Sequence, residues 1–431
     1  MLNKIDERIK SIDELSLREK FKNIIAFHKV SAKTGAGIAD LIESIKSNIT
    51  KLPHIGDKLP EIWLDIRKEL EKLNKDYINY EEYENICQKH KQDKQKAKSL
   101  SEYYHDLGVF LNFQDNHILK EVVFLNPEWA TNAVYKILDT KEIQSNNGKF
   151  DINQVKTIWK DYPETQHKNF LELMKKFELC FQIQDKNTYI IPELLSPHKP
   201  NFDWDYENNL IFEYNYEFMP AGILSRFTVR KNHLLKDDIY WKYGLIMEWE
   251  NTKALVISEP LNRKIKINIK GNDKKTFLGI IREDIEYIHK TFNNLVVKEM
   301  IPCNCGECKN NNNPTFFEYN ELKQYQNENE KYIKCSKIKL KNVDVNDLLT
   351  GIDNNTGLSS ISKIKEFLID KFSDESDFDD LCRELGIKSS IYTGNFKIKI
   401  TNLIQDMESN DPDYIQKLKN TIKKLKPKFD I

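Results

Sequence analysis

The sequence lacks the features that mark membrane, secreted and nucleic-acid-binding proteins. No apolar run approaches the roughly 18–20 residues that span a bilayer, and the charged start MLNKIDERIK is not a signal peptide. The formal net charge is only -1, so no global field attracts nucleic acid or an anionic membrane. The seven cysteines are an odd number, which argues against a disulfide framework. These absences predict a cytoplasmic protein with no membrane span and no nucleic-acid partner.

The sequence also lacks two catalytic signatures. It contains no G-x-x-x-x-G-K-[ST] loop, whose backbone amides and lysine hold nucleotide phosphates. It contains no glycine-rich kinase loop, no HRD aspartate and no DFG motif. We therefore expect this polypeptide alone to show neither GTP hydrolysis, nor tight GTP binding, nor kinase activity.

The composition indicates a globular chain with several domains. Hydrophobic residues make up 39% and charged residues 31%, which excludes a disordered or fibrous protein. A chain of 431 residues is long enough for about two to four domains, each with its own core. Because helical and strand periodicities both occur along it, we predict an α+β multidomain fold.

The clearest local signals lie in residues 106–140. Ile118–Leu125 is predicted to form a strand. Asn126 can cap the first turn of the following helix, and Pro127 suits its first position, where no amide is needed. Apolar residues then recur at three- and four-residue intervals through Leu138, so one face of this helix is expected to be buried.

The next segment has the element order of a winged-helix module. A short helix near Val155 and a longer one over residues 169–178 precede two predicted strands, Cys180–Gln184 and Tyr189–Leu195. The longer helix would be the recognition element, but its exposed charges are mixed, so phosphate contacts would be few. A protein-interaction role fits this module better than DNA binding.

From residue 201 the pattern changes to strands with two helices, one over Met219–Val229 and one over Phe277–Phe292. The predicted strands are Leu210–Tyr216, Tyr243–Trp249, Ala254–Ser258, Lys264–Lys270 and Leu295–Ile301. We expect an antiparallel α+β module. Its aromatic-rich strands could form an interface, although burial within the module is the simpler explanation for them.

Three short motifs in this order resemble the COR domain, the C-terminal partner of the Roc GTPase domain in Roco proteins. They are the Leu-Gly pair at 107–108, the Asn-Pro-x-Trp junction at 126–129, and the Ile-Pro-Glu-Leu-Leu segment at 191–195. The resemblance implies a winged-helix-like COR half over residues 60–200. It also implies an α+β dimerisation half over residues 201–302, and hence a homodimer.

The first fifty residues resemble the end of a Ras-like GTPase. An NKxD sequence at 3–6 and an SAK sequence at 31–33 match the guanine-reading loops of that fold. The resemblance implies that residues 1–51 are the C-terminal remnant of a Roc domain. The residues it implies to contact guanine are Asn3, Lys4, Asp6, Ser31, Ala32 and Lys33.

The phosphate loop and the switch regions of a GTPase have no counterpart in the sequence. We therefore expect GTP or GDP to bind only if an N-terminal part is supplied. The chain is expected to be a truncated product, the product of a split gene, or a fragment. After Gly37 a helix is predicted with one apolar face, formed by Ile38, Leu41, Ile42, Ile45 and Ile49.

A cysteine cluster follows the last predicted strand of the α+β module. The candidate metal ligands are Cys303, Cys305, Cys308 and Cys335. Three close thiols and a distant fourth can close a tetrahedral zinc site, with no position left open for catalysis. Unliganded thiols and redox chemistry remain alternatives. This Cys-rich excursion is assigned to residues 303–340, whereas Cys87, Cys180 and Cys382 are expected to be core residues.

A linker is predicted over residues 341–360 and a helical domain over 361–431. The phrase KFSDESDFDDLCRELGI resembles an effector-associated domain of the death-like type found in bacterial conflict systems. That resemblance implies that a partner protein binds this helical domain.

The leading hypothesis is a non-catalytic signalling and dimerisation portion of a Roco-type GTPase. It would relay the state of the GTPase through a COR dimer to a partner recruited by the C-terminal helical domain. One alternative is part of an active Roco GTPase or Roco-type serine/threonine kinase whose catalytic part lies outside this chain. A further alternative is a zinc-containing winged-helix DNA-binding protein.

Overall fold

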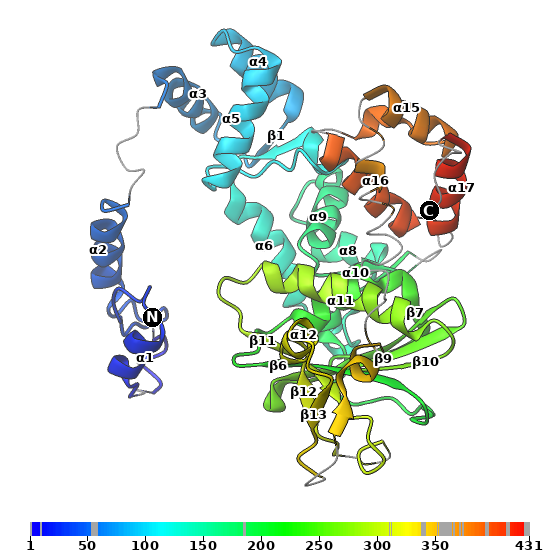
Figure 1. The fold of residues 1–431 in the computed structure, drawn as a ribbon. Coiled ribbons are helices and arrows are strands. Elements are labelled where there is room, and N and C mark those ends of the chain that lie inside the picture. The colour runs from blue at the N-terminus through cyan, green and yellow to red at the C-terminus, as the bar shows by residue number, and fades with distance from the viewer. Residues whose placement is uncertain are drawn as a thin grey trace. The chain divides into compact units, whose positions relative to one another are not determined.

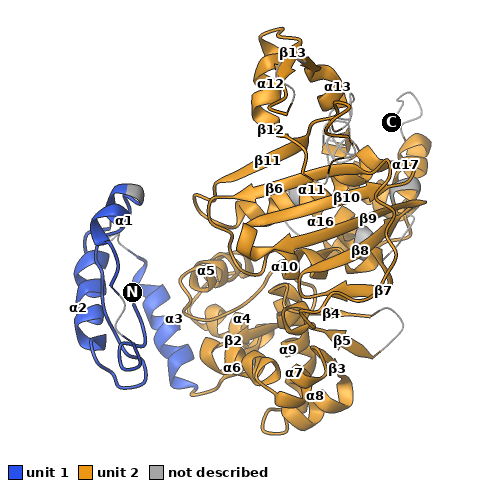
Figure 2. Cartoon of the chain, turned by 90° about the horizontal axis from the view of Figure 1, so that it is seen from below, with its two compact units in different colours: residues 1–73 blue, residues 74–431 orange. Residues whose placement is uncertain are grey.

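The computed structural model describes most of the chain; the exceptions are residues 1, 9–10, 53–58, 184–186, 310, 312, 338–341, 351, 353–363, 365–366, 370–371, 373–374, 393–395, 411–413 and 426–431. Half of the predicted linker at 341–360 lies outside the described residues, namely 341, 351 and 353–360. In the other half, residues 342–344 form a strand and residues 345–350 a helix. The chain divides into two compact units, residues 1–73 and 74–431 (Figure 2). Helices and antiparallel sheets are both present, so the predicted α+β class is confirmed.

In its described residues the first unit contains three helices, α1 (Glu14–Lys20), α2 (Ile38–Ile49) and α3 (Glu61–Lys72). A parallel bridge joins Leu2 and Lys29, and beside it the Val30 amide donates to the Leu2 carbonyl at 2.8 Å. The α2 helix forms where it was predicted. None of its residues is buried, although its apolar residues share one face.

The second unit begins with a mostly helical region. Its elements are β1 (Tyr77–Asn79), α4 (Tyr80–Lys89), α5 (Lys94–Asp106), β2 (Val122–Phe124), α6 (Pro127–Leu138), α7 (Lys141–Ser145), β3 (Lys149–Asp151), α8 (Ile152–Ile158), α9 (Glu164–Lys176), β4 (Phe181–Gln182) and β5 (Thr188–Ile190). The three last strands form a small antiparallel sheet in the order β3-β5-β4.

Helix α6 starts as its sequence predicts. The Asn126 side chain accepts a hydrogen bond from the Trp129 amide at 3.1 Å, and Pro127 occupies the first turn. The preceding strand is shorter than predicted, because Leu119–Glu121 forms a 3-10 turn. Trp159 is fully buried and donates its indole N–H to the Ala133 carbonyl at 2.7 Å, which ties α6 to the end of α8.

A seven-stranded antiparallel sheet follows, in the order β12-β11-β6-β10-β9-β8-β7 (Figure 2). Figure 1 shows the same sheet from another side, with α11 beside it. Its strands are β6 (Leu210–Tyr216), β7 (Leu235–Trp241), β8 (Gly244–Trp249), β9 (Thr252–Glu259), β10 (Lys264–Lys270), β11 (Val297–Pro302) and β12 (Phe316–Glu318). Helices α10 (Ile223–Arg230) and α11 (Lys274–Lys290) share a hydrophobic core with alternate residues of these strands. The prediction had no counterpart for β7.

The remaining elements are α12 (Tyr319–Asn327), β13 (Tyr332–Lys334), β14 (Asn342–Asp344), α13 (Val345–Thr350), α15 (Glu375–Glu384), α16 (Phe396–Asn410) and α17 (Tyr414–Leu425). Phe378, Leu381 and Cys382 of α15 are fully buried. The Tyr392 hydroxyl donates to Asp406 at 2.7 Å. In the part of the chain that the structure describes, no helix combines the length and hydropathy of a bilayer span.

Candidate guanine loops, cysteine cluster and ion network

The two sequence motifs of the first unit meet in space. The Asn3 side chain accepts a hydrogen bond from the Ala32 amide at 3.0 Å and a second one from the Lys4 amide at 2.8 Å. Ser31 is fully buried, and its hydroxyl accepts from the Thr34 amide at 3.1 Å. One asparagine therefore fixes the NKxD loop against the SAK loop.

Gly37 closes the second loop onto α2 with a positive φ of 71°. A Cβ atom at this position would lie 2.3 Å from the Lys29 carbonyl oxygen, so only glycine fits without moving the backbone. The chain thus returns from the Leu2–Lys29 bridge directly into α2.

The other predicted guanine contacts stay open to solvent. Asp6 and Lys33 are exposed, and the Lys4 ammonium lies 3.8 Å from the Glu7 carboxylate. The Asp6 carboxylate is free to accept from a ring N–H group, which is the chemistry its motif implies. The sequence contains no phosphate loop that would complete a nucleotide site at this edge.

The four predicted metal ligands come together at one point. Cys303, Cys305 and Cys308 follow β11, and Cys335 follows β13. Their sulfur atoms all lie within 4.8 Å of one another. The Cys308 and Cys335 sulfurs are 3.6 Å apart, and those of Cys305 and Cys335 are 3.9 Å apart. All four are free thiols.

The thiols of this cluster differ in acidity. Burial raises the pKa of Cys303 and of Cys308. Burial also acts to raise the pKa of Cys335, but contacts with the Thr315 hydroxyl and neighbouring groups outweigh it and lower that pKa to about 6. The predicted core cysteines Cys87, Cys180 and Cys382 are fully buried outside this cluster, and burial raises the pKa of each of them as well.

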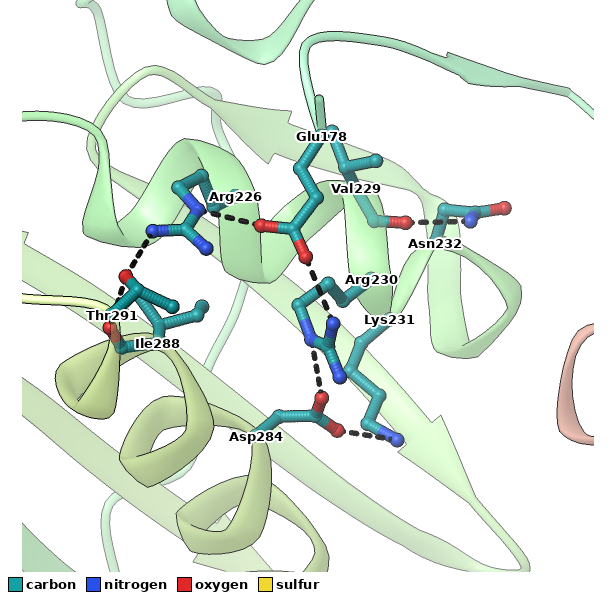
Figure 3. A network of polar contacts seen from close by, with 9 residues as sticks. All are labelled: Glu178, Arg226, Val229, Arg230, Lys231, Asn232, Asp284, Ile288 and Thr291. Atoms are coloured by element: carbon teal, nitrogen blue, oxygen red, sulfur yellow. Dashed lines mark hydrogen bonds and ion pairs between the residues drawn. The ribbon is translucent and has the colours of Figure 1, made fainter. Parts of the chain in front are cut away.

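Sequence reasoning missed a polar network that joins α9 to α10 and α11 (Figure 3). Glu178, just after α9, accepts from Arg226 at 2.5 Å and from Arg230 at 2.8 Å. Arg230 also donates to Asp284 of α11 at 2.6 Å, and the Lys231 ammonium lies 2.6 Å from the same carboxylate. Two carboxylates are therefore held by three cations.

The network is largely withdrawn from water. The side chains of Lys231 and Asp284 are 4% and 9% exposed. Burial alone would raise the pKa of Asp284, yet the charges of Lys231 and Arg230 outweigh it and lower that pKa. An apolar cluster of Phe181, Ile190, Leu195 and Val229 lies between the same regions. The sequence did contain a signal for this network. Asp284 is an acidic residue within the apolar stripe of a predicted helix, and Arg226 and Arg230 lie four residues apart in another helix.

Two family models match the chain. The model described as C-terminal of Roc, COR-A domain, matches residues 60–195, and that described as C-terminal of Roc, COR-B domain, matches residues 207–351. Together they cover well over half of the chain. The interval between them falls between β5 and β6, and the ion network spans it.

Two relatives are similar in sequence to about two thirds of this chain. The Roc-COR-CHAT protease of Runella zeae is 26% identical over 285 residues, which are 63% of this chain and 30% of that protein. The probable serine/threonine-protein kinase pats1 of Dictyostelium discoideum is 24% identical over 311 residues, which are 66% of this chain and 10% of that protein. The chain therefore spans less than a third of the length of either relative.

Among solved structures, Methanosarcina barkeri Roco2 RocCORdC bound to GDP is 32% identical to this chain. The match covers 45% of this chain and 62% of that chain, with a TM-score of 0.37.

Proposed function

Because the chain belongs to the Roco family and carries its COR domain, we propose that it is the non-catalytic signalling and dimerisation portion of such a protein. It relays the state of a GTPase domain through a COR dimer to a partner held by the C-terminal helices. The observation that supports the relay most directly is the buried ion network, which fastens the COR-A region to the COR-B region.

A relay requires the two regions to move as one body or to switch between defined positions. Glu178 belongs to the COR-A region, whereas Arg226, Arg230 and Asp284 belong to the COR-B region. Charged groups held at 2.5–2.8 Å with little solvent resist sliding, because any shift leaves a buried charge without its partner. A displacement of α9 is therefore transmitted to α10 and α11.

Nucleotide enters this proposal only indirectly. The guanine loops at 3–6 and 31–33 provide base contacts, while the phosphate contacts come from a part of the GTPase that this sequence does not contain. GTP or GDP then binds when that part is supplied. The seven free cysteines support a cytoplasmic location, because thiols stay reduced there.

The dimer contact is proposed at one end of the seven-stranded sheet. Three large apolar side chains are exposed there: Phe218 at 71%, Leu261 at 98% and Val296 at 52%. They share that end because the Tyr216 amide donates to the Arg263 carbonyl and the Glu217 amide donates to the Val296 carbonyl. A second copy of the chain would remove these side chains from water.

Light scattering coupled to size exclusion at micromolar concentration tests the dimer. The wild-type chain is expected to have twice its monomer mass, and the double variant Phe218→Asp/Leu261→Asp is expected to be a monomer. Tyr206→Asp is the matched control, because Tyr206 is 57% exposed but precedes the opposite end of β6. A monomeric wild-type chain contradicts the dimer, and a monomeric Tyr206→Asp variant with a dimeric double variant moves the contact to the other end.

A second candidate function follows from the names of the relatives. A protease and a kinase both contain a region like this chain and extend well beyond it. The chain can thus be part of an active Roco GTPase or kinase whose catalytic part lies outside it. The DNA-binding alternative has less support, because the charges of α9 are mixed: Glu164 lies in its first turn, and Lys175 and Lys176 lie in its last turn.

A further inference from the structure

The cysteine cluster consists of four side chains from two separate segments that converge on one small volume. Three of its thiols are almost fully buried, with Cys303 at 3%, Cys308 at 2% and Cys335 at 2% exposure. The sulfur atoms of these four side chains all lie within 4.8 Å of one another, and among the described residues no other group of possible metal ligands is this compact. Nothing in the proposed signalling role uses these thiols.

Two sulfur–sulfur distances of the cluster match the edge of a tetrahedron of ligands around a metal ion. A zinc ion with Zn–S bonds of about 2.3 Å places its ligand sulfurs about 3.8 Å apart along each edge. The distances of 3.6 Å for Cys308–Cys335 and 3.9 Å for Cys305–Cys335 bracket this value. A disulfide requires about 2.05 Å, so these pairs are not positioned as bonded cystines.

We propose that Cys303, Cys305, Cys308 and Cys335 bind one zinc ion as a closed, structural four-thiolate site. Thiolates select soft or borderline cations, and four of them in a tetrahedron suit zinc. Because all four positions belong to the protein, no open site for water or substrate remains. The ion therefore has a structural role.

Backbone and side-chain contacts already hold the ligands in place. The Cys308 amide donates to the Cys305 carbonyl at 2.9 Å, and the Cys303 amide donates to the Thr315 carbonyl at 2.8 Å. The Thr315 amide points at the Cys308 sulfur at 3.5 Å. The two backbone bonds orient the ligand loop, and the Thr315 N–H also partly offsets the negative charge of a Cys308 thiolate.

The site fastens the edge of the large sheet. Strand β12 is an edge strand that pairs with β11 through only three residue pairs. The ligand loop leaves β11 directly, and the fourth ligand follows β13, which among the described residues pairs with the three-residue strand β14. A two-stranded ribbon of this size is marginal in water, so a metal cross-link at its base explains how it keeps its position.

Metal analysis of the full chain, purified without chelator, tests the site. We expect one zinc per chain by elemental mass spectrometry in the wild type and none in Cys308→Ser or Cys335→Ser. Cys382→Ser is the matched control, because Cys382 is equally buried but distant in sequence from the cluster, and it should retain one zinc.

Cobalt spectroscopy makes the test independent of the variants. Wild-type chain stripped of metal and titrated with Co²⁺ should show the visible absorption of tetrahedral cobalt and the thiolate charge-transfer bands, saturating at one equivalent. Absence of these bands, or less than a few tenths of an equivalent of any metal in the purified chain, overturns the site. One equivalent of iron instead of zinc confirms the tetrahedral thiolate site and overturns the choice of metal.

Discussion

Helices α2 and α11 carry similar apolar stripes, with residues three and four positions apart, and yet they differ in what covers them. In α11, Phe277, Leu278 and Ile281 are fully buried against the sheet. In α2, Ile42 is 44% and Ile45 is 48% exposed. Periodicity therefore predicts a helix and its apolar face, but the burial of that face depends on a partner surface that the pattern does not specify.

The two helices also differ in their polar residues. Within α11 the pattern contains Asp284 and His289, which lie among apolar residues and have specific partners. Buried polar groups of this kind determine which arrangement of the neighbouring elements is stable, because each must keep its partner. In the described part of α2, the corresponding side chains face solvent.

The largest predicted effect comes from removing the buried charge of α11. Asp284→Ala leaves Arg230 and Lys231 without their shared carboxylate, and breaking a buried ion pair typically costs about 3–5 kcal/mol of unfolding free energy. Urea unfolding followed by tryptophan fluorescence measures this loss. Lys290→Ala, an exposed change on the same helix, should stay within about 0.5 kcal/mol. A loss below about 1 kcal/mol for Asp284→Ala would show that the network is solvated.

Because of His289 in α11, we expect the unfolding free energy to depend on pH; α2 contains no histidine. Its ring lies against Tyr214 and Tyr216 and is 2.8 Å from the Tyr216 hydroxyl, and burial lowers its pKa from 6.5 to about 4. In the unfolded chain the His289 ring is therefore protonated near pH 6.5, whereas in the folded chain it is protonated only near pH 4. Unfolding free energy should fall as the pH drops through this window, at a slope of at most about 1.4 kcal/mol per pH unit.

Urea unfolding at several pH values between 7 and 4 measures this slope. The variant His289→Gln keeps a hydrogen-bonding group for Tyr216 without titrating, so its slope should be smaller than that of the wild type. The pKa of Asp284 is lowered below its ordinary value of 3.8, so its contribution begins to be lost only at the lower end of this window and is the same in both proteins. Equal slopes for both proteins would contradict the assignment to His289.

Local sequence signals predicted those elements whose cause is local. The start of α6 at Asn126–Pro127 and the bounds of β6 and β10 were predicted correctly, because caps and periodicity act within a few residues. Strand β7 was missed because Asp237 and Asp238 adopt positive φ and interrupt its pairing with β8. The residues of β7 do not alternate in the way that identifies a strand.

Of the long-range contacts, the cysteine cluster was predicted from the sequence and the ion network was not. Closely spaced cysteines are rare enough for the spacing itself to suggest that they meet, and the structure brings all four together. The partners in the ion network are separated by 48 to 54 residues and are of common charged types. The place of Asp284 within the apolar stripe of its helix is unusual, but nothing in the sequence identified its partners or distinguished Glu178 from the many exposed acids. Their role became visible only from the packing of α9, α10 and α11.

The smallest predicted effect completes the comparison of the two helices. Ile281→Ala removes a fully buried side chain and should cost about 2–5 kcal/mol, whereas Ile45→Ala, the same change on a side chain that is 48% exposed, should stay within about 0.5 kcal/mol. Urea unfolding of both variants measures the difference. A loss above about 1 kcal/mol for Ile45→Ala at high protein concentration, which disappears on dilution, would show that a second copy of the chain covers α2. A loss of that size at all concentrations would mean that the stripe of α2 is buried within the chain itself, contrary to its exposure in this structure.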